Sequence, residues 1–294
     1  MKIQTTPLKI WGWVSVIFII TQSVLVLFFF KAKVDLNNNE DYYNQINYMH
    51  QEFRKNNSYK VIIIGSSLIG HGVACSDEIT TYLSSKKNVN INLLKIWDSN
   101  DPLNKFINLN LIEEIIKAKP DLVLFQTELA AINFTKNKQW IQKVSFINKS
   151  IIRYIFSLKQ GNKYSSKNRF CPKNIDIQFE YDTIKHIPQK RKVKPINDLH
   201  FVFNGFKRLQ KEGIKTVLID IPRPVQSEKI IYTKPFNEQL HKLFNVYYNN
   251  FGITHWNYTG APIYYKHCID EGHLNKKGRN IYTEWLLAKI EKEI

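Results

Sequence analysis

Residues 60–72 read Lys60-Val61-Ile62-Ile63-Ile64-Gly65-Ser66-Ser67-Leu68-Ile69-Gly70-His71-Gly72. The run from Val61 to Ile64 is rich in β-branched side chains, which predicts a strand buried on both faces, as in a parallel sheet. The run stops at Gly65, and two serines follow it. Small polar residues just past the carboxyl end of a parallel strand lie where open α/β sheets place their ligands. Ser67 is therefore a candidate nucleophile; the alternative is that Ser66 or Ser67 only caps the next helix.

A second motif lies near the carboxyl end of the sequence. It reads Asp270-Glu271-Gly272-His273-Leu274-Asn275-Lys276-Lys277-Gly278 and precedes an amphipathic stretch, 281–290, that predicts a closing helix. A serine hydroxyl needs a base to take its proton, and that base needs an acidic group to orient it. The spacing of Asp270 and His273 lets a carboxylate in a tight turn hold one imidazole nitrogen. A lone histidine is more often structural, but its pairing with a Gly-Ser-Ser turn is a narrower coincidence.

Together the two motifs resemble the SGNH (GDSL) hydrolase superfamily, with similarity over residues 59–294 and a poor match in the middle. Gly65-Ser66-Ser67 is similar to the first block of the family, and the Asp-x-x-His-Leu-Asn-x-x-Gly run is similar to the last. The resemblance implies a three-layer α/β/α doubly wound parallel sheet of flavodoxin-like type. It also implies that Ser67 is the nucleophile, His273 the general base and Asp270 the residue that orients the base, without a cofactor.

Two other blocks of the family depart from its pattern here. The second block offers a glycine N–H to the oxyanion and the third an asparagine side chain, but strand 90–96 leads into Trp97-Asp98-Ser99-Asn100 and strand 121–126 into Thr127-Glu128-Leu129. Losing one oxyanion donor can cost roughly two to three orders of magnitude in rate. We expect the N–H groups of Ser67 and Ser99 and the side chain of Gln126 to substitute, unless the site is tuned to another acceptor. Membrane-anchored members that serve cell-envelope acyl transfer, such as the DltD and AlgJ types, are similarly loose in these blocks.

The amino-terminal region contains a run without charged residues, Ile10–Phe30, flanked by lysines at 2, 9, 31 and 33. At 1.5 Å per residue such a run is long enough for a hydrocarbon layer about 30 Å thick. No small-x-small cleavage site follows it, so it predicts an uncleaved transmembrane anchor; a helix buried in a soluble core is the alternative. Residues 1–9 would then be a cytoplasmic tail, 31–58 a juxtamembrane stalk, and 59–294 a domain on the extracytoplasmic side of the cell membrane.

The formal net charge is +17, so the surface attracts polyanions. Because no zinc-finger or RRM signature is present, membrane lipid or an anionic envelope polymer suits the chain better than nucleic acid. The three cysteines, Cys75, Cys171 and Cys268, form no metal-binding pattern, and neither do the histidines. Free buried thiols are the main expectation, and a Cys75–Cys268 bridge is the alternative.

The body of the chain alternates helices and strands, which predicts a doubly wound sheet with right-handed crossovers. The expected helices cover 76–86, 103–119, 198–212 and 237–249, and the later strands cover 215–221 and 253–258. Residues 135–199 break the pattern as a basic, aromatic insertion, whose run 189–194 is either a polyanion or partner site or an ordinary solvated loop. Arg223 follows the fourth strand; together with Glu128 it is expected to bind substrate, although a surface salt bridge is the alternative for Arg223.

These features predict a membrane-anchored extracytoplasmic serine acyltransferase. It would move an acyl group to a hydroxyl of an envelope or exported polysaccharide, and acetyl is the acyl group we expect. The resemblance implies a membrane-bound O-acyltransferase partner that supplies the acyl group. The alternatives are an esterase that removes acyl groups from the same polymer, a catalytically silent binding or scaffold domain, and a basic nucleic-acid binder.

Overall fold

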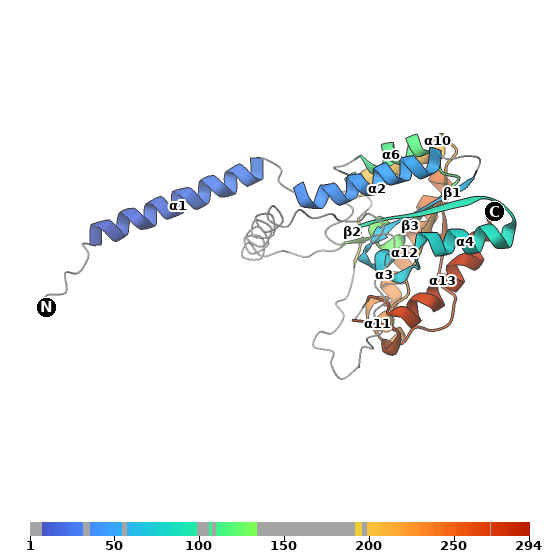
Figure 1. Cartoon of the computed structure of the whole chain (residues 1–294). Coiled ribbons are helices and arrows are strands. Elements are labelled where there is room, and N and C mark those ends of the chain that lie inside the picture. Colours follow the sequence, from blue (N-terminus) through green and yellow to red (C-terminus); the bar gives the residue numbers. More distant parts are fainter. Residues whose placement is uncertain are drawn as a thin grey trace. The chain divides into compact units, whose positions relative to one another are not determined.

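The computed structural model describes residues 8–31, 36–54, 58–98, 106–107, 110–133, 192–195, 199–270 and 272–294. The chain divides into two compact units, Met1–Tyr43 and Asn44–Ile294. Helix α1 of the first unit spans Leu8–Lys31 and contains the uncharged run (Figure 1). Within the described ranges, no helix combines the length and the apolar character that a membrane crossing requires. The anchor at 10–30 stays a prediction from the sequence.

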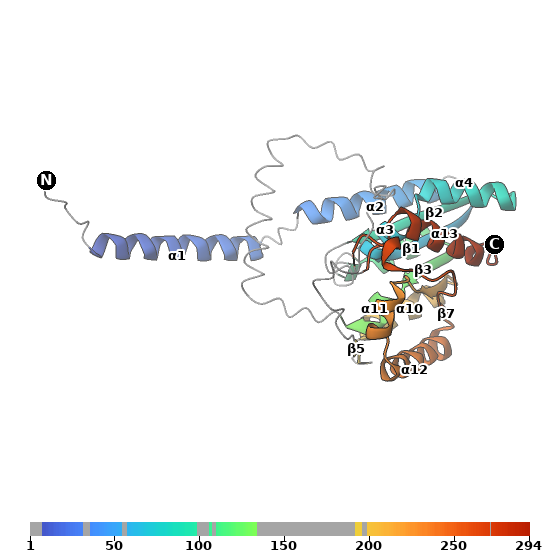
Figure 2. The same ribbon diagram turned by 90° about the horizontal axis from the view of Figure 1, so that it is seen from below.

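The second unit is organised around one five-stranded parallel sheet (Figures 1 and 2). Its strands are β1 (Tyr59–Ser66), β2 (Ile91–Asp98), β3 (Leu122–Gln126), β6 (Lys215–Ile219) and β7 (Thr254–Trp256), in the order β2-β1-β3-β6-β7. Counted within this sheet alone, that order is 2-1-3-4-5, which is the flavodoxin-like order of doubly wound folds. The predicted doubly wound parallel sheet is confirmed.

Strand β1 lies inside the sheet, between β2 and β3. Its residues Val61, Ile62, Ile63 and Ile64 are all 0% exposed, as the β-branched run predicts. One face packs against α3 (Ser67–Gly72), α4 (Ser76–Lys87) and α13 (Lys276–Ile290). That core includes Val61, Ile63, Leu93, Leu124, Leu68, Ile79, Leu83, Tyr282 and Leu286.

The opposite face of the sheet packs against α6 (Leu111–Ala118), α10 (His200–Lys211) and α12 (Lys234–Phe251). Phe125 of β3 meets Phe206 of α10 edge to face at 5.6 Å between ring centroids. Phe206 in turn meets Tyr247 of α12 at 5.4 Å. These aromatic contacts join the central strand to two helices, so the three predicted layers are present.

Helix α2 spans Leu36–Arg54, and its residues from Asn44 onward belong to the α/β unit. Ile46, Met49 and Phe53 recur at helical spacing and are 0–5% exposed. His50 Nε2 lies 2.7 Å from a carboxylate oxygen of Glu114 on α6. The α/β unit therefore begins at Asn44, earlier than the predicted boundary at 59, because this apolar helix face is buried in its core.

The predicted insertion, 135–199, lies mostly outside the described residues. Strand β4 (Ile132–Asn133) pairs antiparallel with β5 (Lys192–Val193), so the chain returns beside the point where it leaves. Lys194 Nζ donates to the carbonyl of Leu129 at 3.2 Å. At least this end of the basic run 189–194 is thus tied to the fold.

Candidate active site

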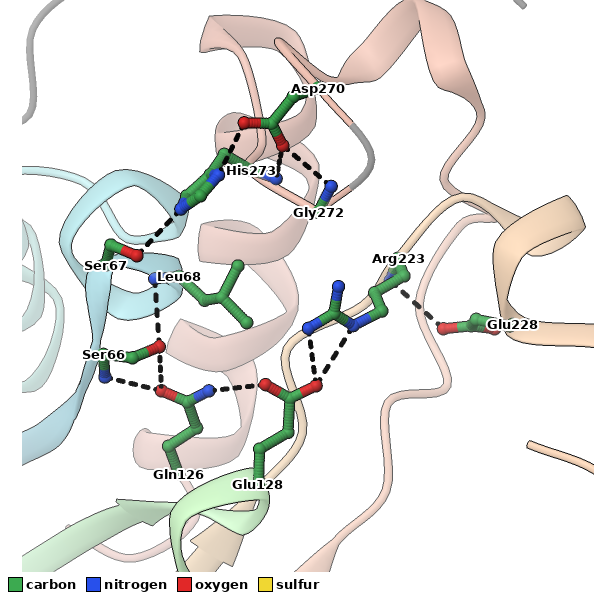
Figure 3. Close-up of polar contacts among 10 residues, drawn as sticks. All are labelled: Ser66, Ser67, Leu68, Gln126, Glu128, Arg223, Glu228, Asp270, Gly272 and His273. Atoms are coloured by element: carbon green, nitrogen blue, oxygen red, sulfur yellow. Dashed lines mark hydrogen bonds and ion pairs between the residues drawn. The ribbon is translucent and has the colours of Figure 1, made fainter. Parts of the chain in front are cut away.

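The nucleophile turn, residues 65–68, joins β1 to α3 at the carboxyl edge of the sheet. Ser66 is the N-cap of α3, and its Oγ accepts a hydrogen bond from the N–H of Leu68 at 3.2 Å. Ser67 is the first residue of the helix, and its Oγ lies 2.8 Å from Nε2 of His273 (Figure 3). The two serines therefore have different tasks: Ser66 caps the helix, and the hydroxyl of Ser67 meets the imidazole.

The histidine turn, made of the described residues 269–270 and 272–274, precedes α13 and supplies the other two groups. His273 Nδ1 lies 2.8 Å from Oδ2 of Asp270 (Figure 3). Oδ1 of Asp270 accepts hydrogen bonds from the backbone N–H of Gly272 and of His273, both at 2.8 Å. Because the carboxylate accepts a hydrogen bond from Nδ1–H, the proton of the neutral ring is on Nδ1. The lone pair of Nε2 therefore points at Ser67. This tautomer is the one in which the imidazole can take a proton from a hydroxyl.

The charge of Asp270 is stabilised within the turn itself. Burial alone would raise its pKa, but the hydrogen bonds from the ring and backbone of His273 and from Gly272 outweigh burial and lower the pKa to about 2. The carboxylate is therefore ionised throughout the physiological pH range. A fixed negative charge at this position stabilises the imidazolium that forms when His273 takes a proton.

The remaining residues of the carboxyl-terminal motif build the support of the histidine turn. The backbone N–H of Ile269 donates to the carbonyl of His273 at 2.8 Å, which closes the turn. Asn275 is the N-cap of α13, and its side chain also donates to the carbonyl of Lys266 at 2.9 Å. A Cβ on Gly278 would lie 2.2 Å from the carbonyl oxygen of His267, so only glycine fits there.

Two buried basic side chains hold the carboxyl end of α3. Lys95 of β2 is 0% exposed, and its Nζ donates to the carbonyl of Val73 at 2.8 Å. Arg279 of α13 donates through Nε to the carbonyl of His71 at 3.0 Å. The short helix that carries Ser67 is thus fixed at its start by Ser66 and at its end by side chains from two other elements.

A second imidazole, His71, lies beside the general-base candidate. The ring centroids of His71 and His273 are 5.3 Å apart and the rings are nearly perpendicular, while the ring of Trp97 lies 6.1 Å from His71. Burial, and then the neighbouring His273 and Arg279, lower the pKa of His71. It is therefore neutral at neutral pH and adds no positive charge beside His273. Sequence reasoning missed this neighbour; its position one helical turn after Ser67 was the available signal.

Gln126 occupies a different place from the one predicted. Its side chain is 0% exposed, and its Oε1 accepts from the backbone N–H of Ser66 at 2.7 Å and from Ser66 Oγ at 3.0 Å. Its Nε2 donates to Oε2 of Glu128 at 2.9 Å. Because an N–H of Ser66 can only donate, this orientation of the amide is fixed. The structure therefore does not place Gln126 as an oxyanion donor, since its amide is held between two neighbours.

Arg223 and Glu128, both predicted to bind substrate, pair with each other instead. Arg223 Nη2 and Nε lie 2.7 Å and 3.0 Å from Oε1 of Glu128, and the two residues are 6% and 3% exposed. Neither charge is open to solvent, so the alternative of a surface salt bridge for Arg223 is also wrong. Ser99, the predicted second backbone donor, lies outside the described residues.

Two of the cysteines are described, and one is a free thiol whereas the other is disulfide-bonded. Cys268 is a free, buried thiol, and burial raises its pKa to about 12. Cys75 is disulfide-bonded, so the free-thiol prediction is wrong there, and the alternative Cys75–Cys268 bridge is excluded. Within the described ranges, no group of three or more His, Cys, Asp or Glu side chains is arranged to hold a metal ion.

Comparison with known proteins finds matches among solved structures only at low sequence identity. No protein-family model matches the chain, and no curated protein matches it. The matching structures include a GDSL-like lipase from Bacteroides thetaiotaomicron, 12% identical over 85% of this chain and 99% of the other, with a TM-score of 0.40. They also include the periplasmic domain of a lipopolysaccharide acetyltransferase from Salmonella ser. Paratyphi A, 13% identical over 80% of this chain and 85% of the other, with a TM-score of 0.38.

A catalytic mutant of an acetylxylan esterase from Geobacillus stearothermophilus is a third such structure, 13% identical over 80% of this chain and 96% of the other, with a TM-score of 0.41. Similarity at this level does not identify a family. The fold and the site by themselves define a doubly wound α/β protein with a serine, a histidine and an aspartate hydrogen-bonded in sequence at the carboxyl edge of its sheet.

Proposed function

We propose that this chain is a serine acyl-transfer enzyme of SGNH type. The observation that carries the proposal is the hydrogen-bonded row from Ser67 through His273 to Asp270, with 2.8 Å at each link. These groups come from two turns more than 200 positions apart in the chain. Hydrogen-bonded nucleophile, base and orienting carboxylate are the signature of nucleophilic catalysis by serine.

In the first half of the reaction, Ser67 Oγ attacks the carbonyl carbon of an acyl donor while His273 Nε2 takes its proton. The negative charge that develops on the carbonyl oxygen is held by the backbone N–H of Ser67 and by one further donor, for which Ser99 remains the candidate. The tetrahedral intermediate collapses, the imidazolium returns its proton to the leaving oxygen, and an acyl-serine ester remains.

In the second half, His273 deprotonates an acceptor hydroxyl, which attacks the acyl-serine carbonyl. The acyl group moves to the acceptor, and the proton returns to Ser67 Oγ. Water as acceptor gives an esterase, and a sugar hydroxyl gives a transferase. The same site serves both outcomes, so rates with and without an acceptor glycan separate them.

A serine-directed fluorophosphonate tests the shared first step. We expect the full chain to be labelled at Ser67, and we expect Ser67→Ala and His273→Ala to lose the label. Mass spectrometry of the labelled peptide distinguishes Ser67 from Ser66. Labelling that persists at full rate in a folded Ser67→Ala variant would rule out the proposed nucleophile.

The acceptor we propose is a hydroxyl of an anionic envelope or exported polysaccharide, with acetyl as the acyl group. The formal charge of +17 supports a polyanionic partner. The disulfide at Cys75 supports an oxidising compartment outside the cytoplasm. Membrane anchoring through residues 10–30, and a membrane-bound O-acyltransferase that supplies the acyl group, remain proposals from the sequence. Membrane fractionation and co-purification with such a transferase test them.

A catalytically silent domain that binds an envelope polymer is the second candidate. It is favoured by one observation: the amide of Gln126 is held between Ser66 and Glu128, and the N–H of its Nε2 that is accounted for donates to Glu128. This candidate predicts that Ser67→Ala retains full biological function. Loss of function in that variant, with polymer binding intact, would exclude it.

A further inference from the structure

Buried hydrogen bonds connect the nucleophile turn with the loop after β6 (Figure 3). The N–H of Ser66 donates to Oε1 of Gln126 at 2.7 Å, and Nε2 of Gln126 donates to Oε2 of Glu128 at 2.9 Å. Oε1 of Glu128 accepts from both Nη2 and Nε of Arg223, at 2.7 Å and 3.0 Å. The side chains that form these links are 0–6% exposed. Three strands, β1, β3 and β6, are thus linked at their carboxyl ends.

The same guanidinium lies against the histidine turn. A Cβ built on Gly272 would lie 2.6 Å from Nη1 of Arg223, so the arginine is in close contact with the backbone of Gly272, next to His273. The backbone N–H of Arg223 donates to Oε1 of Glu228 at 3.1 Å, which fixes the loop that carries it. Arg223 therefore holds Glu128 with one edge and supports the histidine turn with another.

We propose that Gln126, Glu128 and Arg223 form a positioning network that sets the distance between Ser67 and His273. None of the three contacts the reacting atoms, so they are positioning residues. One end of the network holds the backbone N–H next to Ser67, and the other limits where the backbone before His273 can lie. The kinetic consequence of this inference rests on the proposed acyl transfer, and its structural consequence does not.

Charge and geometry both suit the network to this task. Burial would lower the pKa of Arg223, but Glu128 outweighs burial and raises the pKa, so the guanidinium stays charged. A planar guanidinium with two bonds to one carboxylate fixes orientation as well as distance. An apolar pair of similar size could stabilise the fold as well or better. The buried ion pair is therefore best explained by the orientation that it imposes on the two turns.

Hydrogen exchange of the full chain tests the structural consequence. The variant Arg223→Met with Glu128→Gln removes both charges together, so neither remains buried and unpaired. We expect faster exchange at the amides of Ser66, Gly272 and His273. The matched control, Glu114→Gln with His50→Gln, removes a 2.7 Å pair between α2 and α6, away from this loop, and should leave those amides unchanged. Unchanged exchange in the network variant would overturn the proposal. If that variant does not fold, Arg223→Lys replaces it, because lysine keeps the positive charge but lacks the planar guanidinium. Faster exchange at the same three amides is again expected, and unchanged exchange would again overturn the proposal.

Kinetics of an activated ester test the catalytic consequence. Misplacing reacting groups by about 1 Å can cost roughly 100-fold in rate, so we expect kcat to fall by roughly 10- to 100-fold. KM should stay within about twofold, because the network does not touch the substrate. Arg223→Lys should give an intermediate kcat, and an unchanged kcat in the double variant would contradict the network. If the fluorophosphonate never labels Ser67 in the wild-type chain, the proposed function is wrong. The hydrogen-exchange result would still show whether the network positions the two turns.

Discussion

At the residue scale, Asp270 fixes which nitrogen of His273 carries the proton. In Asp270→Asn, the oxygen can still accept from the backbone of the turn, so the amide nitrogen faces Nδ1. The imidazole must then carry its proton on Nε2, which can no longer accept one from Ser67. We expect kcat for an activated ester to fall by roughly 10⁴-fold, the cost of the same change in a serine protease.

The control for this prediction is Asp220→Asn, which alters a second His–Asp pair, at 2.9 Å, outside the site. It should keep kcat near the wild-type value. Thermal unfolding should show that both variants are folded. An Asp270→Asn protein that turns over at the wild-type rate would show that the tautomer of His273 does not matter.

Gly278 allows α13 to start directly beneath the histidine turn. An alanine there would place a Cβ 2.2 Å from the carbonyl oxygen of His267, a backbone atom that cannot move without moving the turn. We expect Gly278→Ala to lower the free energy of unfolding by about 1–3 kcal/mol, as overpacking usually does. Gly72→Ala is the matched control, because its Cβ would meet its nearest neighbour at 3.6 Å. Urea unfolding measures both, and equal stability of the two variants would contradict this account.

Single residues differ in how far the sequence could predict their place. The structure has Ser67 Oγ 2.8 Å from His273 Nε2, and the sequence points to both residues because each lies in a short motif whose backbone geometry is local. The sequence predicts Gln126 as an oxyanion donor and Glu128 and Arg223 as substrate-binding residues, whereas the structure pairs these side chains with one another. Their pairing spans up to 95 positions, and no local pattern shows that one buried side chain will neutralise another.

At the element scale, α3 is stabilised by a buried lysine from β2. Burial, and then the charge of Arg279, lower the pKa of Lys95 from 10.5 to about 7. Between these values the unfolded chain binds a proton that the folded chain has released. The free energy of unfolding should therefore rise as the pH increases from about 7 toward 10.5.

Lys95→Met removes this titration while keeping most of the side-chain volume. The difference in unfolding free energy between wild type and variant should shift in favour of the wild type between pH 7 and pH 9.5, as measured by urea unfolding. The range stops below pH 10 because tyrosines with raised pKa values begin to oppose the trend above it. If the unfolding free energies of wild type and Lys95→Met change in parallel with pH, Lys95 does not titrate in this range.

Long elements could be predicted and short ones could not. The sequence predicted helices over 76–86 and 237–249, and the structure has α4 at Ser76–Lys87 and α12 at Lys234–Phe251. It gave no bounds for α3, six residues long, although a cap at Ser66 or Ser67 implies a helix there, and it missed α7 (Thr127–Ala131), which has five residues. Helices this short show less than two turns of periodicity, so their side-chain pattern is not distinct from that of a loop.

At the scale of the whole molecule, the second half of α2 completes the core of the α/β unit. Met49 is 0% exposed, whereas Asn47 on the same helix is exposed. We expect Met49→Ala to lower the free energy of unfolding by about 2–5 kcal/mol, and Asn47→Ala to change it little. Chemical denaturation of the full chain measures both. Equal effects would indicate that this helix is not part of the unit.

The architecture as a whole followed from the alternation of strands and helices, because parallel strands need crossover helices and right-handed crossovers leave few topologies. The domain boundary did not follow, since Ile46, Met49 and Phe53 give the same helical spacing in a stalk as in a core helix. Only the packed structure shows that this face is buried.

Covalent acylation of Ser67 tests the central claim most directly. The full chain would be mixed with an activated acetyl ester, quenched in acid and digested, and the peptide that contains residues 65–68 would be weighed. The account predicts an acetyl adduct on Ser67 that disappears in His273→Ala and in Ser67→Ala. A folded wild-type chain that hydrolyses or transfers the acetyl group without ever carrying it on Ser67 would contradict the account.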